Sequence, residues 1–148
     1  MIKLFALALL MGLVGFAAYV RVARIDPGDY HVDPVTADVP KVPGHALIRP
    51  GGPNEPPIYT ISTGELAEKL EAVITQTPRT RLLEGSLKDG FASYVIRSAL
   101  WGFPDIANVK VIDLGEGRST FAILSRLRIG QMDFGVNEAR VASWMSQL

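Results

Sequence analysis

The sequence contains no cysteine among its 148 residues. Disulfides, Cys-ligated zinc, iron–sulfur clusters and thiol nucleophiles are therefore excluded. Histidine is scarce as well, since only two are present, and a His-rich metal site is not expected. The chain also has no excess of one charge sign, because 15 basic residues balance 15 acidic ones. A general nucleic-acid binder, in contrast, usually carries a basic surplus. We therefore expect no cofactor, no metal and no nucleic-acid partner.

The N-terminus carries a long apolar run that raises the mean hydropathy of the chain to +0.22. Residues 4–20 contain no charged side chain, and as a helix they would be about 25 Å long, at the lower edge of what spans a bilayer. A cleaved signal peptide is the alternative, with Lys3 as its basic region. However, the best small-residue triplet, Gly15-Phe16-Ala17, lies inside the run. The pattern predicts an uncleaved signal anchor over residues 1–25.

Charges on the two sides of this segment do not settle its orientation. Lys3 and the terminal amine precede it, and Arg21 and Arg24 follow it, so the positive-inside rule is balanced. We expect a single-pass protein of the bacterial inner membrane with its domain on the periplasmic side, because the segment has the character of a signal-derived anchor.

Proline dominates the next segment, residues 26–57, which hold eight of the ten prolines. Proline fixes φ and removes a backbone donor, so neither a helix nor a central strand is expected here. In polyproline II this segment could reach about 100 Å. It predicts either a semi-rigid tether or, given its several valines, an extended segment lying along a partner. We interpret His31 and His45 as ordinary residues of this tether.

Residues 58–148 have the pattern of a folded α+β domain. A short β run at 58–61 precedes a capping box, Ser62-Thr63-Gly64-Glu65, and a helix with an apolar stripe that Pro78 ends. Two hairpins follow, with strands expected at 79–87, 91–101, 108–114 and 119–129. Asn137 is expected to cap a last helix, with Val136 and Val141 as a hydrophobic staple.

The expected order is therefore β-α-β-β-β-β-α. It predicts an antiparallel sheet of four to five strands with two helices on one face and solvent on the other. One N-terminal transmembrane helix precedes this domain.

Several charged side chains are placed to form a polar cluster near the C-terminus. Arg126 and Arg128 point to the same face of their strand, and Asp133 follows shortly after. In the structural interpretation, arginines hold the loops through carboxylate pairs. In the functional one, guanidinium groups and the amides that begin the last helix bind an anion. The candidate set, for which no catalytic constellation is readable, is Arg97, Asp105, Arg126, Arg128, Asp133, Asn137 and Arg140.

The stretch from Ser125 to Val141 resembles the signature of the bacterial family of unknown function called DUF1499. Arg128, Gly130, Asp133, Gly135, Asn137 and Arg140 fall in register with it, and Phe103-Pro104-Asp105 supplies an upstream element. The similarity covers residues 58–148. It implies an exported or membrane-attached protein, and it implies no general catalytic activity. Many relatives keep a second aspartate where this chain has Ile106, which disfavours a metal site of paired carboxylates.

Two functions of different class follow as expectations. The first is a non-enzymatic, membrane-anchored accessory subunit of a larger inner-membrane complex, respiratory or photosynthetic, with other membrane-protein subunits as partners. The second is an exported domain that binds a lipid or small anionic ligand, with Arg126 and Arg128 facing the anion. An enzyme is the least expected class.

Overall fold

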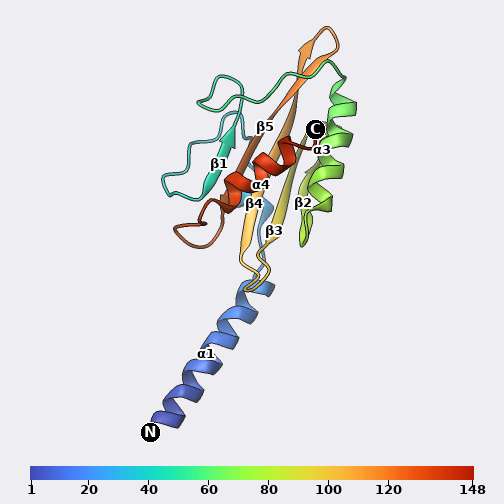
Figure 1. The fold of residues 1–148 in the computed structure, drawn as a ribbon. Coiled ribbons are helices and arrows are strands. Elements are labelled where there is room, and N and C mark those ends of the chain that lie inside the picture. Colours follow the sequence, from blue (N-terminus) through green and yellow to red (C-terminus); the bar gives the residue numbers. More distant parts are fainter.

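The computed structural model describes residues 1–148 and shows a long N-terminal helix that leads into an α+β domain (Figure 1). This confirms the predicted fold class. The helices are α1 (Ile2–Val22), α2 (Pro27–Tyr30), α3 (Thr63–Gln76) and α4 (Val136–Met145), with a short 3-10 turn η1 (Leu87–Asp89). The strands are β1 (His45–Ile48), β2 (Thr80–Ser86), β3 (Phe91–Arg97), β4 (Pro104–Gly115) and β5 (Arg118–Leu127).

The five strands form one antiparallel sheet in the order β1-β5-β4-β3-β2. The two predicted hairpins are present, as β2–β3 and β4–β5. At the first turn Gly90 adopts a φ of +96°, the conformation that only glycine reaches without strain. Each hairpin therefore places neighbouring strands side by side, and the sheet is completed by β1 at its far edge.

Helix α3 begins as the sequence predicts. The Ser62 hydroxyl accepts a hydrogen bond from the Glu65 amide, and the Glu65 carboxylate accepts one from the Ser62 amide. Apolar side chains at helical spacing then face the sheet, and those that are fully buried are Leu66, Leu70 and Ile74. Burial of each stabilises the fold by about 1.5–3 kcal/mol. This stripe fixes α3 on one face of the sheet.

Helix α4 covers the same face beside α3 (Figure 1). Its Val141 and Trp144 are buried in the core that α3 and the sheet share. The Trp144 indole also donates a hydrogen bond of 2.8 Å to the Thr77 hydroxyl at the end of α3. The two helices on one face agree with the prediction.

The opposite face of the sheet is not solvated, contrary to the prediction. Residues 23–37, which we call the N-terminal belt, pass across it. Ile25 of the belt is buried against Val95 and Ile106, and these three form a second small core. Asp33 pairs with Lys110 of β4. Residues Val95 and Ile106 point away from the helices, so they would be exposed apolar side chains without this cover.

The predicted tether over residues 26–57 is largely part of the fold. Its segment His45–Ile48 forms β1, paired with β5 from His45↔Arg126 to Ile48↔Ile123. Prolines stand on both sides of this segment but not within it, so its amides remain free to pair, and an edge strand tolerates such neighbours. Arg49 then donates hydrogen bonds to the carbonyls of Val35 and Ala37, which links β1 to the belt.

Other expected elements shift in position. The strand expected at 58–61 is reduced to one bridge between Tyr59 and Ser119. The strand expected at 91–101 ends at Arg97, and the next one begins at Pro104 instead of residue 108. A proline is acceptable at the first position of a strand. The loop between these two strands therefore lies at residues 98–103, earlier in the chain than the expected 102–107 and equally long.

Candidate functional site

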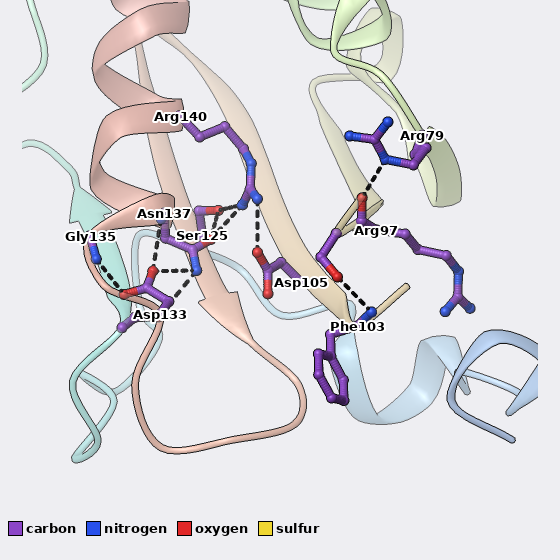
Figure 2. Close-up of polar contacts among 11 residues, drawn as sticks. Arg79, Arg97, Phe103, Asp105, Ser125, Asp133, Gly135, Asn137 and Arg140 are labelled. Atoms are coloured by element: carbon purple, nitrogen blue, oxygen red, sulfur yellow. Dashed lines mark hydrogen bonds and ion pairs between the residues drawn. The ribbon is translucent and has the colours of Figure 1, made fainter. Parts of the chain in front are cut away.

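The seven predicted candidate residues fall on the two opposite faces of the sheet. Asp105, Asp133, Asn137 and Arg140 gather on the α4 side, and Figure 2 shows them with Ser125 between β4, β5 and the start of α4. The remaining three, Arg97, Arg126 and Arg128, belong to the other side. Alternation along β5 separates Ser125 from Arg126, because successive side chains point to opposite faces.

Arg140 connects the strands to α4. Its Nη2 lies 2.8 Å from Oδ2 of Asp105, and the two side chains are only 11% and 10% exposed. Its Nη1 donates to Oδ1 of Asn137 at 2.6 Å and to the hydroxyl of Ser125 at 3.2 Å. Burial raises the pKa of Asp105, and the guanidinium of Arg140 opposes that rise. Asp105 thus depends on Arg140 for its charge.

Asp133 lies in the loop before α4 and serves as its capping acceptor. Its carboxylate accepts hydrogen bonds from the amides of Gly135 and Asn137 and from the Asn137 side chain, at 3.0, 2.7 and 2.8 Å. Burial alone would raise the pKa of Asp133, but these hydrogen bonds hold it below the ordinary value. A carboxylate at this end of a helix is also stabilised by the helix dipole.

The start of α4 differs from the predicted cap. Gly135 is the N-cap residue, with a left-handed φ of +80°, and Asn137 lies inside the helix. The predicted staple is absent, because Val136 is 50% exposed whereas Val141 is buried. The Asn137 side chain instead donates to the carbonyl of Gly44, at 3.2 Å, which ties α4 to the start of β1.

We call Asp105, Ser125, Asp133, Asn137 and Arg140 the polar cluster. Its hydrogen-bonding groups are directed at one another, and four of its five residues, all except Arg140, are buried. The Ser125 hydroxyl donates to Asn137 at 2.5 Å. The arrangement joins β4, β5, α4 and the loop before β1, and its chemistry is that of a buried, mutually satisfied network.

Two of the three remaining arginines, Arg97 and Arg128, donate hydrogen bonds to backbone carbonyls of the N-terminal segment. Arg97 donates to the carbonyls of Val20 and Gly102, both at 2.9 Å. Arg128 donates to the carbonyl of Arg24 at 3.2 Å, and its guanidinium lies 5.6 Å from the centre of the Tyr30 ring. Neither arginine forms the carboxylate pair that the structural interpretation expected.

Arg126 and Arg128 also do not converge on the N-terminus of α4, as the predicted anion site required. Burial lowers the pKa of Arg126, whose neighbour is Tyr30 of the belt. Arg128 Nε is buried without a hydrogen-bond partner. The belt therefore lies over both side chains on the face opposite α4.

Sequence reasoning missed a second polar group, beneath the belt. Nδ1 of His31 lies 2.7 Å from the hydroxyl of Ser93, and its ring stacks on Phe91 with centroids 4.0 Å apart. The Asn108 side-chain amide donates to Ser93 and to the carbonyl of Tyr30, both at 2.7 Å. The available signal was the placement of Ser93 and Asn108 in otherwise apolar strands. His31 is thus an anchoring residue of the belt and not an ordinary tether residue.

Three or more His, Asp or Glu side chains do not come together anywhere in the structure in a way that could hold a metal ion. The family model described as "Protein of unknown function (DUF1499)" matches residues 31–148. The chain belongs to the DUF1499 family. The DUF1499 match begins at His31 and so includes residues 31–37 of the belt and all of β1. A search of curated proteins and a search of solved structures each found no match to the chain.

Helix α1 lies entirely before the DUF1499 region. Its 21 residues have a mean hydropathy of 2.0 over the most apolar window, and none of that window is buried in the protein. By length and composition α1 could cross a membrane or act as a signal sequence.

Proposed function

We propose that this DUF1499 protein is a non-enzymatic accessory subunit of a larger inner-membrane complex. In this proposal α1 remains in the membrane as a single span, and the domain lies on the periplasmic side. The observation that carries the proposal is the junction between α1 and the domain. A helix that only tethered a mobile domain would not need packing contacts or hydrogen bonds with that domain.

Contacts at this junction involve the last turns of α1. Val20 is fully buried, and its carbonyl accepts the hydrogen bond from Arg97 described above. Arg21 donates to the carbonyl of Leu100 at 2.6 Å. The rings of Phe16 and Phe103 lie 6.2 Å apart in a tilted arrangement. These contacts support a domain held at a fixed height and angle at the end of the helix.

The rest of α1 presents apolar side chains around its whole circumference. Leu4, Phe5 and Met11 are 72%, 74% and 67% exposed. Lipid or the helices of other subunits would cover this surface. A helix that positions a domain while offering its own surface to neighbouring helices suits a subunit that holds an assembly together. The polar cluster, whose groups bind one another, supports a structural role of the domain.

The test is co-migration of the full chain, with a C-terminal tag, in native membranes solubilised in mild detergent. We expect the tagged protein to migrate on a native gel with a defined larger complex, and mass spectrometry of that band to give the other subunits. Migration of the protein alone, as a small species, would contradict the proposal.

A helix-exchange variant sharpens this test. It replaces residues 2–15 of α1 with an unrelated apolar segment of equal length and leaves Phe16, Val20 and Arg21 in place. The domain contacts are then preserved, and only the surface for neighbouring helices changes. We expect co-migration to fall while membrane retention stays. Unchanged co-migration would contradict α1 as the surface that binds the partner and would assign that contact to the domain.

Orientation is tested with a cysteine introduced at an exposed site, since the chain has none of its own. Ile58 is 61% exposed and suits this purpose. A membrane-impermeant maleimide should label Ile58→Cys in intact cells with a permeable outer membrane. Labelling only after the inner membrane is broken would place the domain in the cytoplasm.

A further inference from the structure

Several loops of the domain meet at the end of the sheet next to α1. Antiparallel pairing fixes this geometry: Thr80 pairs with Ile96, Arg97 with Pro104, and Asp105 with Leu127. The start of β2, the β3–β4 loop and the β5–α4 loop therefore share one end of the sheet. The β3–β4 loop lies against the last turns of α1 (Figure 1). We call this the helix-proximal end.

Large apolar side chains are exposed on two loops of this end, the β3–β4 loop and the β5–α4 loop. On the β3–β4 loop Leu100 is 74% exposed and Trp101 is 42% exposed. On the β5–α4 loop Met132 is 60% exposed and Phe134 is 89% exposed. Exposed apolar side chains that gather at one end of a domain mark a contact surface. Tryptophan in particular favours the boundary between water and bilayer, where its ring is half-immersed.

A basic groove lies beside these loops. It has a volume of about 560 Å³, and its charged lining residues are Arg21, Arg24, Arg81 and Arg97, with no carboxylate among its walls. None of the four forms an ion pair within the protein. Burial lowers the pKa of Arg97, and the neighbouring charges of Arg81, Arg128 and Arg21 lower it further. Such uncompensated positive charge favours an anion, and guanidinium groups match phosphate geometry.

We propose that the helix-proximal end rests on the bilayer surface, where the arginine groove binds the headgroup phosphates of anionic lipids and Leu100 and Trp101 enter the interface. This rests on α1 spanning the membrane, as proposed above. The groove contains Arg21 and Arg24, the residues that directly follow the apolar part of α1. When α1 spans the bilayer, a groove at that position lies at the level of the lipid headgroups. Its apolar flanks distinguish a lipid surface from a site for free phosphate.

The first experiment uses a fluorescent reporter in the full chain. Leu100→Cys carries an environment-sensitive dye, and the protein is reconstituted into nanodiscs of phosphatidylcholine with phosphatidylglycerol. The matched control is Ile58→Cys, which is similarly exposed but lies near the β4–β5 turn at the other end of the sheet. We expect blue-shifted emission and quenching by nitroxide lipids at position 100 only.

The second experiment counts bound lipids by native mass spectrometry of the full chain released from detergent. Arg24→Gln with Arg81→Gln removes two exposed charges of the groove. Lys88→Gln with Arg118→Gln removes two exposed charges at the opposite end. We expect the groove variant to reduce the retention of phosphatidylglycerol about thirtyfold, since each of the two lost cations contributes about fivefold near an anionic surface. The control variant should leave retention unchanged.

The outcomes separate this proposal from membrane anchoring. If the protein enters nanodiscs but position 100 emits like position 58, the anchor stands and the surface contact is overturned. If the groove variant and the control variant retain phosphatidylglycerol equally, the arginine groove is overturned as the lipid site. Retention of added inorganic phosphate without phosphatidylglycerol would also overturn the lipid assignment. If the chain fails to enter nanodiscs, anchoring itself fails, and the surface contact fails with it.

Discussion

Arg140 holds the one nearly buried ion pair of the molecule, with Asp105. Replacement by methionine keeps most of the side-chain volume but leaves the Asp105 carboxylate buried without its partner. We expect Arg140→Met to lower the free energy of unfolding by about 3–5 kcal/mol. Denaturant unfolding of the full chain in detergent, followed by tryptophan fluorescence, measures this. Arg118→Met, which removes an exposed cation, should change stability by less than about 0.5 kcal/mol.

The double variant Asp105→Leu with Arg140→Met separates the ion pair from the packing around it. Since no charge is then left buried alone, we expect it to recover much of the stability that Arg140→Met loses. Equal instability of the single and double variants would contradict the pair as the main contribution of Arg140.

Asp133 gives the fold a defined dependence on pH. Its pKa is lowered in the folded state, so its contribution to stability is complete above its unfolded pKa and is lost as the pH falls through the folded one. We expect Asp133→Asn to cost about 1–2 kcal/mol at neutral pH, since the loop loses a charged acceptor.

The same variant should lose part of the acid sensitivity of the wild type. The difference in stability between the two proteins should shrink as the pH falls from about 5 toward about 2. Thermal unfolding across this range is the measurement. A constant difference would show that the charge of Asp133 is not what stabilises the start of α4.

At the scale of elements, the sequence predicts those features that are formed by contacts between residues close together in the chain. The capping box of α3 and the turn at Gly90 use residues within a few positions of one another, and both were readable from the sequence. Strand β1 was not, because its pairing with β5 joins residues about 80 positions apart. The prolines around it correctly indicate irregular backbone on both sides. The short stretch between them lacks proline, and there the pairing with β5 forms a strand that local sequence does not predict.

The candidate site shows the same division. The polar residues near the C-terminus were recognised, and four of the seven do come together. The sequence could not show that Arg126 and Arg128 would lie on the other face, since that depended on which side α4 packs. Nor could it show that a distant segment would cover them. Asp133 replaced Asn137 as the capping acceptor because a left-handed Gly135 turns the loop back toward the helix.

Asn108 tests the attachment of the belt. It is fully buried in β4 and donates hydrogen bonds to Tyr30 and Ser93. We expect Asn108→Ala to destabilise the belt by about 1–3 kcal/mol, because the Tyr30 carbonyl loses its partner. Chymotrypsin should then cut after Tyr30 faster than in the wild type. Asn54→Ala, an exposed site, is the control, and equal cutting of both variants would contradict the role of Asn108.

At the scale of the whole molecule, the folded unit extends well before residue 58. A chain that begins at residue 20 keeps the belt and β1, and we expect it to unfold cooperatively in aqueous buffer. A chain that begins at residue 58 lacks both, so it exposes the edge of β5 and uncovers Val95 and Ile106. We expect it not to fold. Circular dichroism with thermal unfolding compares the two chains. Equal stability would show that the belt and β1 are a tether and not part of the folded unit.

The central claim is that α1, the belt and the sheet form one body at the membrane. Hydrogen–deuterium exchange of the full chain in nanodiscs tests it most directly. We predict slow exchange at Ala23, whose amide donates to Tyr19, at the belt amides of His31 and Ala37, and along β1, at rates approaching those of the sheet. Exchange of residues 23–57 at the rate of a free peptide would contradict the account and leave a mobile domain on a flexible tether.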